Sequence, residues 1–390
     1  MSYAAIQSFM REQKIDGWLL YDFRGSNPIL AQLLPGKRWT TRRVMMLIPA
    51  EGEARLLVHH IDSGMFKGAA VAQDLYLTWQ ELRAWVAKQT EGKGRVAMEY
   101  APGGSLPVMG IVDAGTIELV RSCGVDVVSS ANLVQVSVAV WSADAVAGHA
   151  RASKHCARIM LGAFDLIRAR LKASAAVNEY EVQQWIVDEF KRAGLETADA
   201  PIVGANGHAG DPHFEVSATS PTAIVKGDWI LIDLWAREPG EENIFSDITW
   251  VGYAGTTVPA RHRAVFEAVK AARDAGVACV KRGWDAKQAV QGWQVDDASR
   301  EQIVKAGFAS GIKHRTGHSL SAGPKVHGMG VNIDNLETHD TRELLPGVGF
   351  TIEPGAYFAD LGVRMEINVY MDPFRGPVVT SCVQDEVEFV

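Results

Sequence analysis

The last third of the chain carries five side chains that could bind metal ions through oxygen or nitrogen atoms. In order along the chain they are Asp233, Asp247, His318, Glu353 and Glu366. Four of the five follow or flank apolar residues with high β propensity, so a strand framework could hold each of these side chains in place. Mn²⁺ and Co²⁺ bind carboxylate oxygens together with a histidine nitrogen, and Zn²⁺ accepts the same ligands. The series therefore indicates a metal-dependent hydrolase.

The charges of this set match two divalent cations rather than one. Four carboxylates and a neutral imidazole carry four negative charges, which two divalent ions neutralise and a single ion does not. Without metal the clustered carboxylates would repel one another, and some would take up protons. Two ions about 3.5–4 Å apart can share a water molecule and lower its pKa enough to give hydroxide at neutral pH. A hydroxide of this kind is suited to attack a stable carbonyl group, such as that of a peptide bond.

Helices and strands alternate in the part of the chain that carries these residues. A long helix is predicted after residue 150, where apolar residues recur at spacings of three and four. Its apolar stripe consists of Cys156, Ile159, Met160, Ala163, Phe164, Ile167 and Leu171. The next helix begins with Asn178 as a cap and Glu181 three residues later, which approximates a capping box. Residues 259–282 and 288–306 are predicted as a second helix pair. Each pair precedes strands with two of the carboxylates, a pattern typical of an internal duplication.

The first part of the chain has the pattern of a separate α/β domain. Residues 2–13 are predicted as a short helix with Ser2 as its cap, and residues 79–87 as another helix. Strands are predicted at residues 17–21, 43–48, 54–58 and 96–100. Such alternation is typical of an α/β domain, and this part has no glycine loop of the kind that binds phosphate. The sequence predicts an α/β N-terminal domain over residues 1–147 and a second domain over residues 148–390.

Composition and charge narrow the class of protein. A chain of 390 residues is longer than a domain with a single hydrophobic core usually is, so two domains are expected. A composition of 47% hydrophobic and 22% charged residues is typical of a soluble globular protein. The net charge of −7 argues against a nucleic-acid partner. No apolar run approaches the ~18 residues that span a bilayer, and the first residues do not resemble a signal peptide. The four cysteines form no CxxC pair. We expect a cytoplasmic protein without a membrane partner.

The five candidate ligands, in this order, resemble the signature of the pita-bread metallopeptidases: methionine aminopeptidase, aminopeptidase P and prolidase. The resemblance covers nearly all of residues 150–390, and the α/β domain before it is similar to that of the aminopeptidase P and prolidase branch. It implies an α+β pita-bread catalytic domain with two divalent ions, Mn²⁺, Co²⁺ or Zn²⁺. It also implies that Asp233 binds one ion, that His318 and Glu353 bind the other, and that Asp247 and Glu366 bridge them. Similar two-domain proteins are often homodimers, which we expect here.

Further residues match positions of this family. His213, in Asp211-Pro212-His213-Phe214, and His327 resemble residues that bind substrate and stabilise the tetrahedral intermediate. Imidazole N–H groups suit a developing oxyanion, and Glu353 is expected to shuttle the proton. His314 resembles a position that supports the metal ligands from behind. Arg364, two residues before Glu366, could bind the terminal carboxylate of a substrate or brace Glu366.

The sequence departs from the family pattern in its spacings. Asp233 and Asp247 are 14 positions apart, which fits a longer turn around residues 237–241. His318 and His327 are also spaced more widely, with residues 321–324 as the expected insertion. Prolidases often carry an arginine shortly after the second histidine, and residues 329–332 contain none. The identities of the ligands are unaffected by these departures, whereas strict specificity for Xaa-Pro dipeptides is put in doubt.

Two short segments resemble other catalytic motifs. Gly317-His318-Ser319-Leu320-Ser321 approaches the Gly-x-Ser-x-Gly elbow of α/β-hydrolases, with Ser319 as nucleophile, but the last glycine is missing. His314 and His318 have the spacing of a helical zinc site, but the glutamate of that motif is absent and Gly317 opposes a helix. Both alternatives are weaker than the five-ligand series.

The leading hypothesis is a dinuclear metallopeptidase that hydrolyses N-terminal Xaa-Pro bonds of short peptides, as an Xaa-Pro dipeptidase or an Xaa-Pro aminopeptidase. A peptidase of the same fold without proline specificity is an alternative hypothesis. A metal-free amidinohydrolase of the creatinase type would share both domains, but it predicts lost ligands, and all five are present here. A non-catalytic binding module predicts eroded ligands and ranks last for the same reason.

Overall fold

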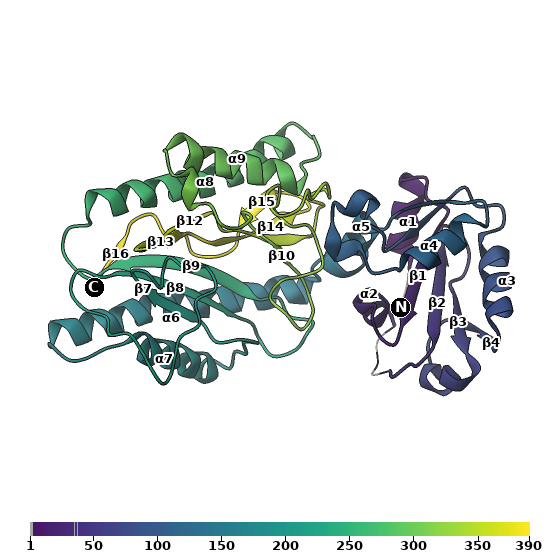
Figure 1. Cartoon of the computed structure of the whole chain (residues 1–390), viewed down its shortest axis with the longest axis horizontal. Coiled ribbons are helices and arrows are strands. Elements are labelled where there is room, and N and C mark those ends of the chain that lie inside the picture. The colour runs from purple at the N-terminus through teal and green to yellow at the C-terminus, as the bar shows by residue number, and fades with distance from the viewer. Residues whose placement is uncertain (1–2, 35, 37) are drawn as a thin grey trace. The chain divides into compact units, whose positions relative to one another are not determined.

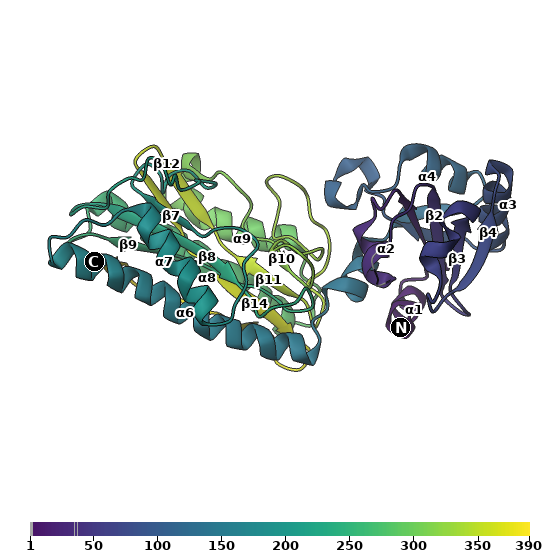
Figure 2. The same cartoon turned by 90° about the horizontal axis from the view of Figure 1, so that it is seen from below.

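The computed structural model describes residues 3–34, 36 and 38–390, which form two compact units, Met1–Val138 and Ala139–Val390 (Figures 1 and 2). The domain boundary that we expected between residues 147 and 148 falls inside helix α6, Ala143–Lys172. The second unit begins earlier because Trp141, only 5% exposed, already packs within it and donates from Nε1 to the Leu320 carbonyl at 2.7 Å. Ser142 then caps α6 by accepting a hydrogen bond from the Ala145 N–H.

The first unit is built around a six-stranded sheet of order β4-β3-β2-β1-β5-β6. Its strands are β1 (Gly17–Phe23), β2 (Arg43–Pro49), β3 (Arg55–His59), β4 (Ala72–Tyr76), β5 (Arg95–Met98) and β6 (Asp126–Ser129). Its α-helices are α1 (Ala4–Glu12), α2 (Pro28–Leu33), α3 (Trp79–Thr90), α4 (Ala114–Arg121) and α5 (Ala131–Val134). The α/β prediction is confirmed, although β4 and β6 were not predicted. Helix α1 begins after Tyr3, and the expected cap Ser2 lies outside the described residues.

The second unit places strands between two helix pairs, with α6 and α7 on one side and α8 and α9 on the other (Figure 1). The other three helices are α7 (Glu179–Arg192), α8 (Ala260–Asp285) and α9 (Gly292–Lys305). One sheet has the order β16-β9-β8-β7, a second has the order β10-β11-β14-β15, and β12 pairs with β13. The strands are β7 (Ile202–Ala205), β8 (Trp229–Ala236), β9 (Ser246–Tyr253), β10 (Ser319–Leu320), β11 (Gly349–Ile352), β12 (Gly355–Phe358), β13 (Leu361–Arg364), β14 (Ile367–Asp372), β15 (Gly376–Val379) and β16 (Glu388–Phe389). The helix pairs and the strands that follow them were predicted from the sequence.

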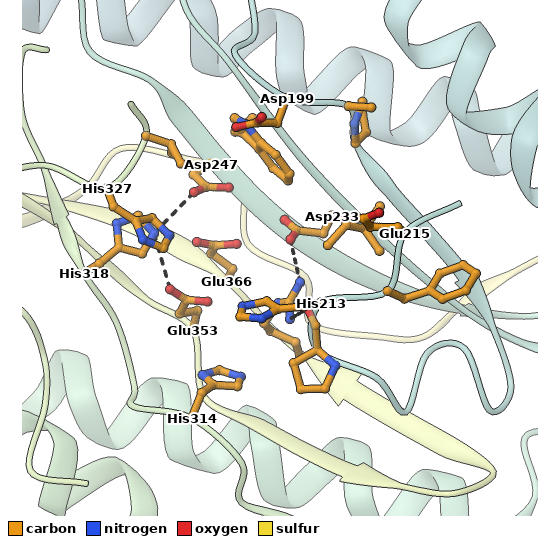
Figure 3. Close-up of a pocket in the computed structure, with 18 of the residues that line it drawn as sticks. Asp199, His213, Glu215, Asp233, Asp247, His314, His318, His327, Glu353 and Glu366 are labelled. Atoms are coloured by element: carbon orange, nitrogen blue, oxygen red, sulfur yellow. Dashed lines mark hydrogen bonds and ion pairs between the residues drawn. The ribbon is translucent and has the colours of Figure 1, made fainter. Parts of the chain in front are cut away.

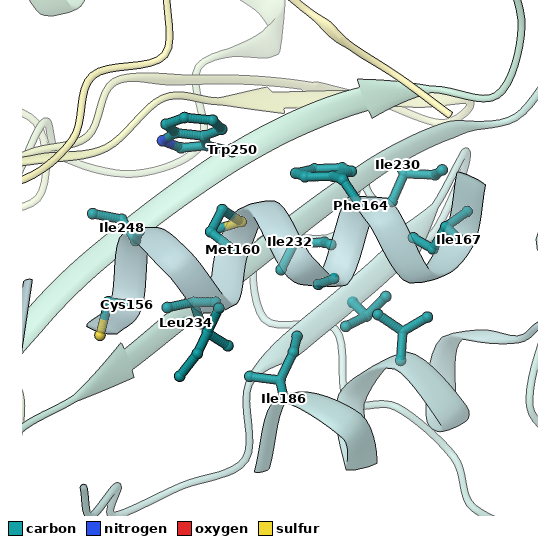
Figure 4. Packing of buried hydrophobic residues seen from close by; sticks show 14 of the residues in the cluster. Cys156, Met160, Phe164, Ile167, Ile186, Ile230, Ile232, Leu234, Ile248 and Trp250 are labelled. Carbon is teal, nitrogen blue, oxygen red and sulfur yellow. The ribbon is translucent and has the colours of Figure 1, made fainter. Parts of the chain in front are cut away.

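The apolar stripe of α6 packs against the sheet that carries the first two candidate ligands (Figure 4). Met160 and Phe164 on α6 face Ile232 on β8 and Trp250 on β9 in one buried cluster. Full burial of a side chain of this size contributes about 1.5–3 kcal/mol, so the cluster fixes β8 and β9 firmly. The predicted capping box at the start of α7 is also present. Asn178 Oδ1 accepts from the Glu181 N–H at 2.9 Å, and Glu181 Oε2 accepts from the Asn178 N–H at 3.2 Å.

Within residues 3–34, 36 and 38–390, none of the helices combines the length and the apolar character that crossing a bilayer requires.

Candidate metal centre and substrate cleft

The five predicted metal ligands line one cleft of the second unit (Figure 3). Asp233 lies on β8 and Asp247 on the antiparallel strand β9, where Asp233 pairs with Thr249. Asp247 is two residues from Thr249, so both aspartates project from the same face of the sheet. The other three ligands, His318, Glu353 and Glu366, lie at strand ends next to β10, β11 and β14. Side chains at strand ends can converge while their backbone stays in the sheets.

His318 lies close to three of the carboxylates. His318 Nε2 lies 3.4 Å from Asp247 Oδ2 and 3.4 Å from Glu353 Oε1. The other ring nitrogen of His318, Nδ1, is 3.0 Å from the Ser319 carbonyl, which directs Nε2 toward the carboxylates. Asp247, His318 and Glu366 each offer a ligand atom within 4.8 Å of the other two. These donors are close enough to share a cation.

Two threonines orient the glutamates. Thr249 Oγ1 donates to Glu366 Oε2 at 2.9 Å, and Thr351 Oγ1 donates to Glu353 Oε1 at 3.1 Å. Neither threonine was predicted as a site residue from the sequence. Thr249 could have been found, because it follows Asp247 by two residues in a strand and so shares its face. Thr351 precedes Glu353 by two residues at the end of β11 and is as near in sequence, whereas the bond from Thr249 to Glu366 joins two distant segments of the chain.

Two carboxylate oxygens of the site accept no hydrogen bond from the described residues. Asp233 Oδ1 and Glu366 Oε1 are buried without a hydrogen-bond partner among the described residues. Burial raises the pKa of Asp247 to about 7, and burial together with the charges of Asp247 and Glu353 raises the pKa of Glu366 strongly. Buried oxygens that lack donors are uncommon, and a cation would satisfy them. The residues present therefore fit a divalent metal centre.

The three other histidines predicted for the site lie in the same cleft, whose volume is about 710 Å³. The imidazole of His327 lies against His318, with ring centroids 4.0 Å apart. Positive charge on His318, together with burial, lowers the pKa of His327 to about 3, so His327 is neutral at pH 7. His213 lies on the loop that follows β7 and is exposed toward the cleft.

His314 is linked to Asp233 through two further side chains. Its Nε2 lies 2.7 Å from the Tyr357 hydroxyl, which in turn accepts from Arg364 Nη1 at 2.9 Å. Arg364 Nη2 donates to Asp233 Oδ2 at 2.5 Å. His314 therefore lines the cleft and is connected to Asp233 through Tyr357 and Arg364. Tyr357 was not identified from the sequence, because nothing in the local pattern of β12 connects it to residues so distant.

Arg364 contacts an aspartate directly and is linked to Glu366 through Thr249. Its Nε donates to Thr249 Oγ1 at 3.0 Å, and its two terminal nitrogens bind Tyr357 and Asp233. The side chain is 5% exposed, so the guanidinium is occupied and buried. The sequence offered Arg364 as a group that binds the substrate's carboxylate or braces Glu366, and the structure places it on Asp233.

The two weaker motifs do not form the structures that they require. Ser319 is buried on the two-residue strand β10, and its Oγ accepts from the Gly330 N–H at 2.9 Å. It is therefore not exposed on a strand-to-helix turn. Residues 314–318 contain no helical turn, so His314 and His318 do not form a helical pair.

Comparison with known proteins agrees with the geometry. The model of metallopeptidase family M24 matches residues 148–373. The putative dipeptidase YkvY of Bacillus subtilis is 30% identical over 211 residues, which are 54% of this chain and 53% of that protein. The Xaa-Pro dipeptidase of Pyrococcus furiosus is 30% identical over 193 residues, 49% of this chain and 50% of that protein. The chain thus spans about half the length of the curated relatives that it matches.

Solved structures share the fold over the whole chain. Dipeptidase PepE from Mycobacterium ulcerans covers 99% of this chain and 96% of its own, with a TM-score of 0.69 at 23% identity. The prolidase from Pyrococcus horikoshii covers 98% of both chains, with a TM-score of 0.62 at 21% identity. These likenesses confirm the predicted pita-bread domain and the α/β domain before it. Because the family match covers more than half of the sequence, the chain belongs to metallopeptidase family M24.

Proposed function

We propose that this protein is a dinuclear metallopeptidase that removes the N-terminal residue from short peptides, with Xaa-Pro bonds as its preferred target. The observation that carries the proposal is the convergence of four carboxylates and one imidazole in one cleft, with two buried carboxylate oxygens that lack any donor among the described residues. The relatives named as a putative dipeptidase and an Xaa-Pro dipeptidase support the substrate class. Family membership supports the reaction class.

Each ligand has a proposed place in the centre. Asp233 would hold one ion, His318 and Glu353 the other, and Asp247 and Glu366 both. When bound, two divalent ions supply an activated water and polarise the scissile carbonyl. The native metal would be Mn²⁺, Co²⁺ or Zn²⁺, since all three accept this mixture of oxygen and nitrogen donors.

Glu353 has the properties of the group that moves the proton. Burial alone would raise its pKa, but the neighbouring His318, His314 and Arg364 outweigh burial and lower it. Glu353 therefore stays ionised near pH 7 and can accept a proton from the attacking water. The same carboxyl can return that proton to the leaving amine, as general base and then general acid.

Two histidines of the cleft, His327 and His213, would hold the substrate. His327 is neutral and can donate a hydrogen bond to the oxyanion that develops on the carbonyl carbon. His213 reaches the cleft from a different loop and would bind the peptide beyond the scissile bond. Arg364 would brace Asp233, to which it donates directly, and it also lines the cleft where the substrate's terminal carboxylate would bind.

The ligand assignment is tested by two substitutions with matched controls. Asp247→Ala and Glu366→Ala should abolish metal uptake and turnover together, whereas Asp285→Ala and Glu301→Ala, at exposed positions, should change neither. Metal is counted by mass spectrometry on purified protein, which also separates this proposal from a metal-free amidinohydrolase. Full activity of either ligand variant would rule out the bridging role.

Substrate preference needs a separate assay. Hydrolysis of Xaa-Pro dipeptides, Xaa-Pro tripeptides and matched Xaa-Ala peptides should be measured with Mn²⁺, Co²⁺ and Zn²⁺ in turn. We expect the Xaa-Pro series to react fastest. Equal rates on Xaa-Ala would point to a peptidase of this fold without proline specificity.

We also propose a homodimer in the cytoplasm. The expectation of a dimer comes from the similarity to two-domain relatives. Light scattering after size-exclusion chromatography would show twice the chain mass if the proposal is right, and the chain mass of 42.4 kDa if it is not.

A further inference from the structure

The loop that carries His213 connects β7 with β8 and is held by contacts away from the imidazole itself. The His213 ring makes no hydrogen bond to any residue that the structure describes; only its backbone N–H does, to Asp211 Oδ1 at 3.1 Å. The loop leaves β7 through tight turns, with His208 N–H donating to the Ala205 carbonyl at 3.0 Å and Phe214 N–H to the Asp211 carbonyl at 3.2 Å. Whatever fixes the position of His213 must therefore act through its neighbours.

A buried carboxylate anchors the base of this loop. Glu179 is the first residue of α7 and is 1% exposed. Its Oε1 accepts from the Ala205 N–H at 2.7 Å, and its two oxygens lie 2.9 and 3.0 Å from His208 Nδ1. A buried carboxylate needs such partners, so the His208 ring is fixed where β7 ends.

The His208 ring then supports the residue next to His213. His208 and Phe214 are stacked, with centroids 4.0 Å apart and planes inclined by 20°. On the other side of His213, the Pro212 carbonyl lies 3.5 Å from Arg364 Nη1. His213 is therefore flanked by two supported residues, and the Phe214 support leads back to α7.

We propose that Glu179, His208 and Phe214 form a positioning chain that holds the His213 imidazole at its place in the cleft. His208 is not among the residues that line the cleft, so it acts on substrate only through the loop. The inference deepens the proposed function, because it rests on the role given there to His213. It makes His208 a positioning residue for the reaction rather than a group that touches substrate.

Kinetics of single and double variants test whether His208 acts through His213. His208→Ala should lower kcat/KM for an Xaa-Pro peptide by about ten- to a hundredfold, because small misplacements of a catalytic group have effects of this size. In a His213→Ala background the same substitution should have almost no further effect, since coupled residues are not additive. His60→Ala, an exposed histidine in the first unit, is the control and should match the wild type. Equal effects of His208→Ala in both backgrounds would overturn the proposal.

A second pair of variants keeps the Glu179–His208 contact intact. Phe214→Leu removes the stacked ring and should lower activity as His208→Ala does, whereas Phe214→Tyr keeps the ring and should lower activity much less. Phe374→Leu, at a turn position that is 92% exposed, is the matched control. If Phe214→Leu is as active as Phe214→Tyr, the stack has no positioning role.

Hydrogen–deuterium exchange gives a readout that does not depend on turnover. In His208→Ala and Phe214→Leu, peptides from residues 206–216 should exchange faster than in the wild type, while peptides from α8 stay unchanged. Unchanged exchange in residues 206–216 would refute the positioning chain whatever the activity. Faster exchange together with a fully active His213→Ala enzyme would support the anchoring and instead refute the role proposed for His213.

Discussion

Arg364 and Asp233 form a buried ion pair between β13 and β8, with Nη2 donating to Oδ2 at 2.5 Å. The pair occupies one oxygen of the aspartate and leaves the other, Oδ1, without a partner among the described residues. Arg364 thus holds Asp233 in the orientation that presents Oδ1 as a free acceptor. A cation at the centre would use that oxygen, and the guanidinium compensates part of the negative charge when no cation is present.

Replacing Arg364 should therefore destabilise the metal-free protein more than the metal-loaded protein. Arg364→Met leaves a buried carboxylate without its cation, which typically costs about 3–5 kcal/mol. Added Mn²⁺ restores positive charge beside Asp233, so the loss should be smaller in its presence. Urea unfolding with and without Mn²⁺ measures both free energies. Arg151→Met is the control, because the Arg151–Glu238 pair is exposed and such pairs contribute about 1 kcal/mol or less. Equal losses in both states would contradict the charge argument.

Glu366→Gln should change stability and metal binding in opposite directions. The raised pKa of Glu366 reflects burial and repulsion by Asp247 and Glu353, so removing its charge should leave the metal-free protein equally stable or more stable. The same substitution removes a ligand and should abolish the rise in Tm that Mn²⁺ gives to the wild type. Thermal melts with chelator and with Mn²⁺ measure the two effects. A variant that loses stability without metal, yet keeps its metal-induced rise, would contradict both expectations.

Glu99 should make the first unit less stable as the pH rises. It is fully buried and accepts from Trp18 Nε1 at 2.6 Å and from Asn27 Nδ2 at 2.9 Å, yet burial prevails and raises its pKa from 4.5 to about 7. Between these two values the folded state keeps a proton that the unfolded state has lost. The free energy of unfolding therefore has its full value below about pH 4.5 and falls by up to about 3 kcal/mol as the pH rises to 7. Calorimetry between pH 4.5 and 8 would show the slope.

Glu99→Gln should remove this slope, because an amide does not titrate. Its absolute stability can differ from that of the wild type, so the slope and not the level is the quantity to compare. Glu118→Gln, at an exposed position, should keep the wild-type slope. A Glu99→Gln slope equal to that of the wild type would show that another group is responsible.

His149 should give the second unit the opposite pH dependence. The imidazole is 1% exposed and lies 3.0 Å from the Phe245 carbonyl and 2.8 Å from Thr380 Oγ1, and burial lowers its pKa from 6.5 to about 4. The unfolded state binds a proton in this interval and the folded state does not. The free energy of unfolding has its full value above about pH 6.5 and falls by up to about 3 kcal/mol as the pH falls to 4. His149→Gln should weaken this acid sensitivity in calorimetry, while His155→Gln on the same helix should leave it intact.

Local patterns in the sequence were sufficient for many elements of the fold. The stripe from Cys156 to Ile167 predicts α6 because a helix turns once in 3.6 residues, and Asn178 with Glu181 predicts the start of α7 because both side chains reach backbone N–H groups within one turn. The domain boundary was predicted less well. Whether Trp141 packs with the first or the second unit depends on contacts with Leu320, far along the chain.

For the site, the sequence determined which side chains could bind metal, because Asp233, Asp247, His318, Glu353 and Glu366 are recognisable by type and order. Only the tertiary structure decided which groups support them. Tyr357 joins His314 to Arg364, Thr249 donates to Glu366, and Arg364 donates directly to Asp233. The physical reason is the separation along the chain between the residues that interact. Helix periodicity and caps depend on neighbours within a few residues, whereas the partner of a buried charge depends on which distant strands lie beside it.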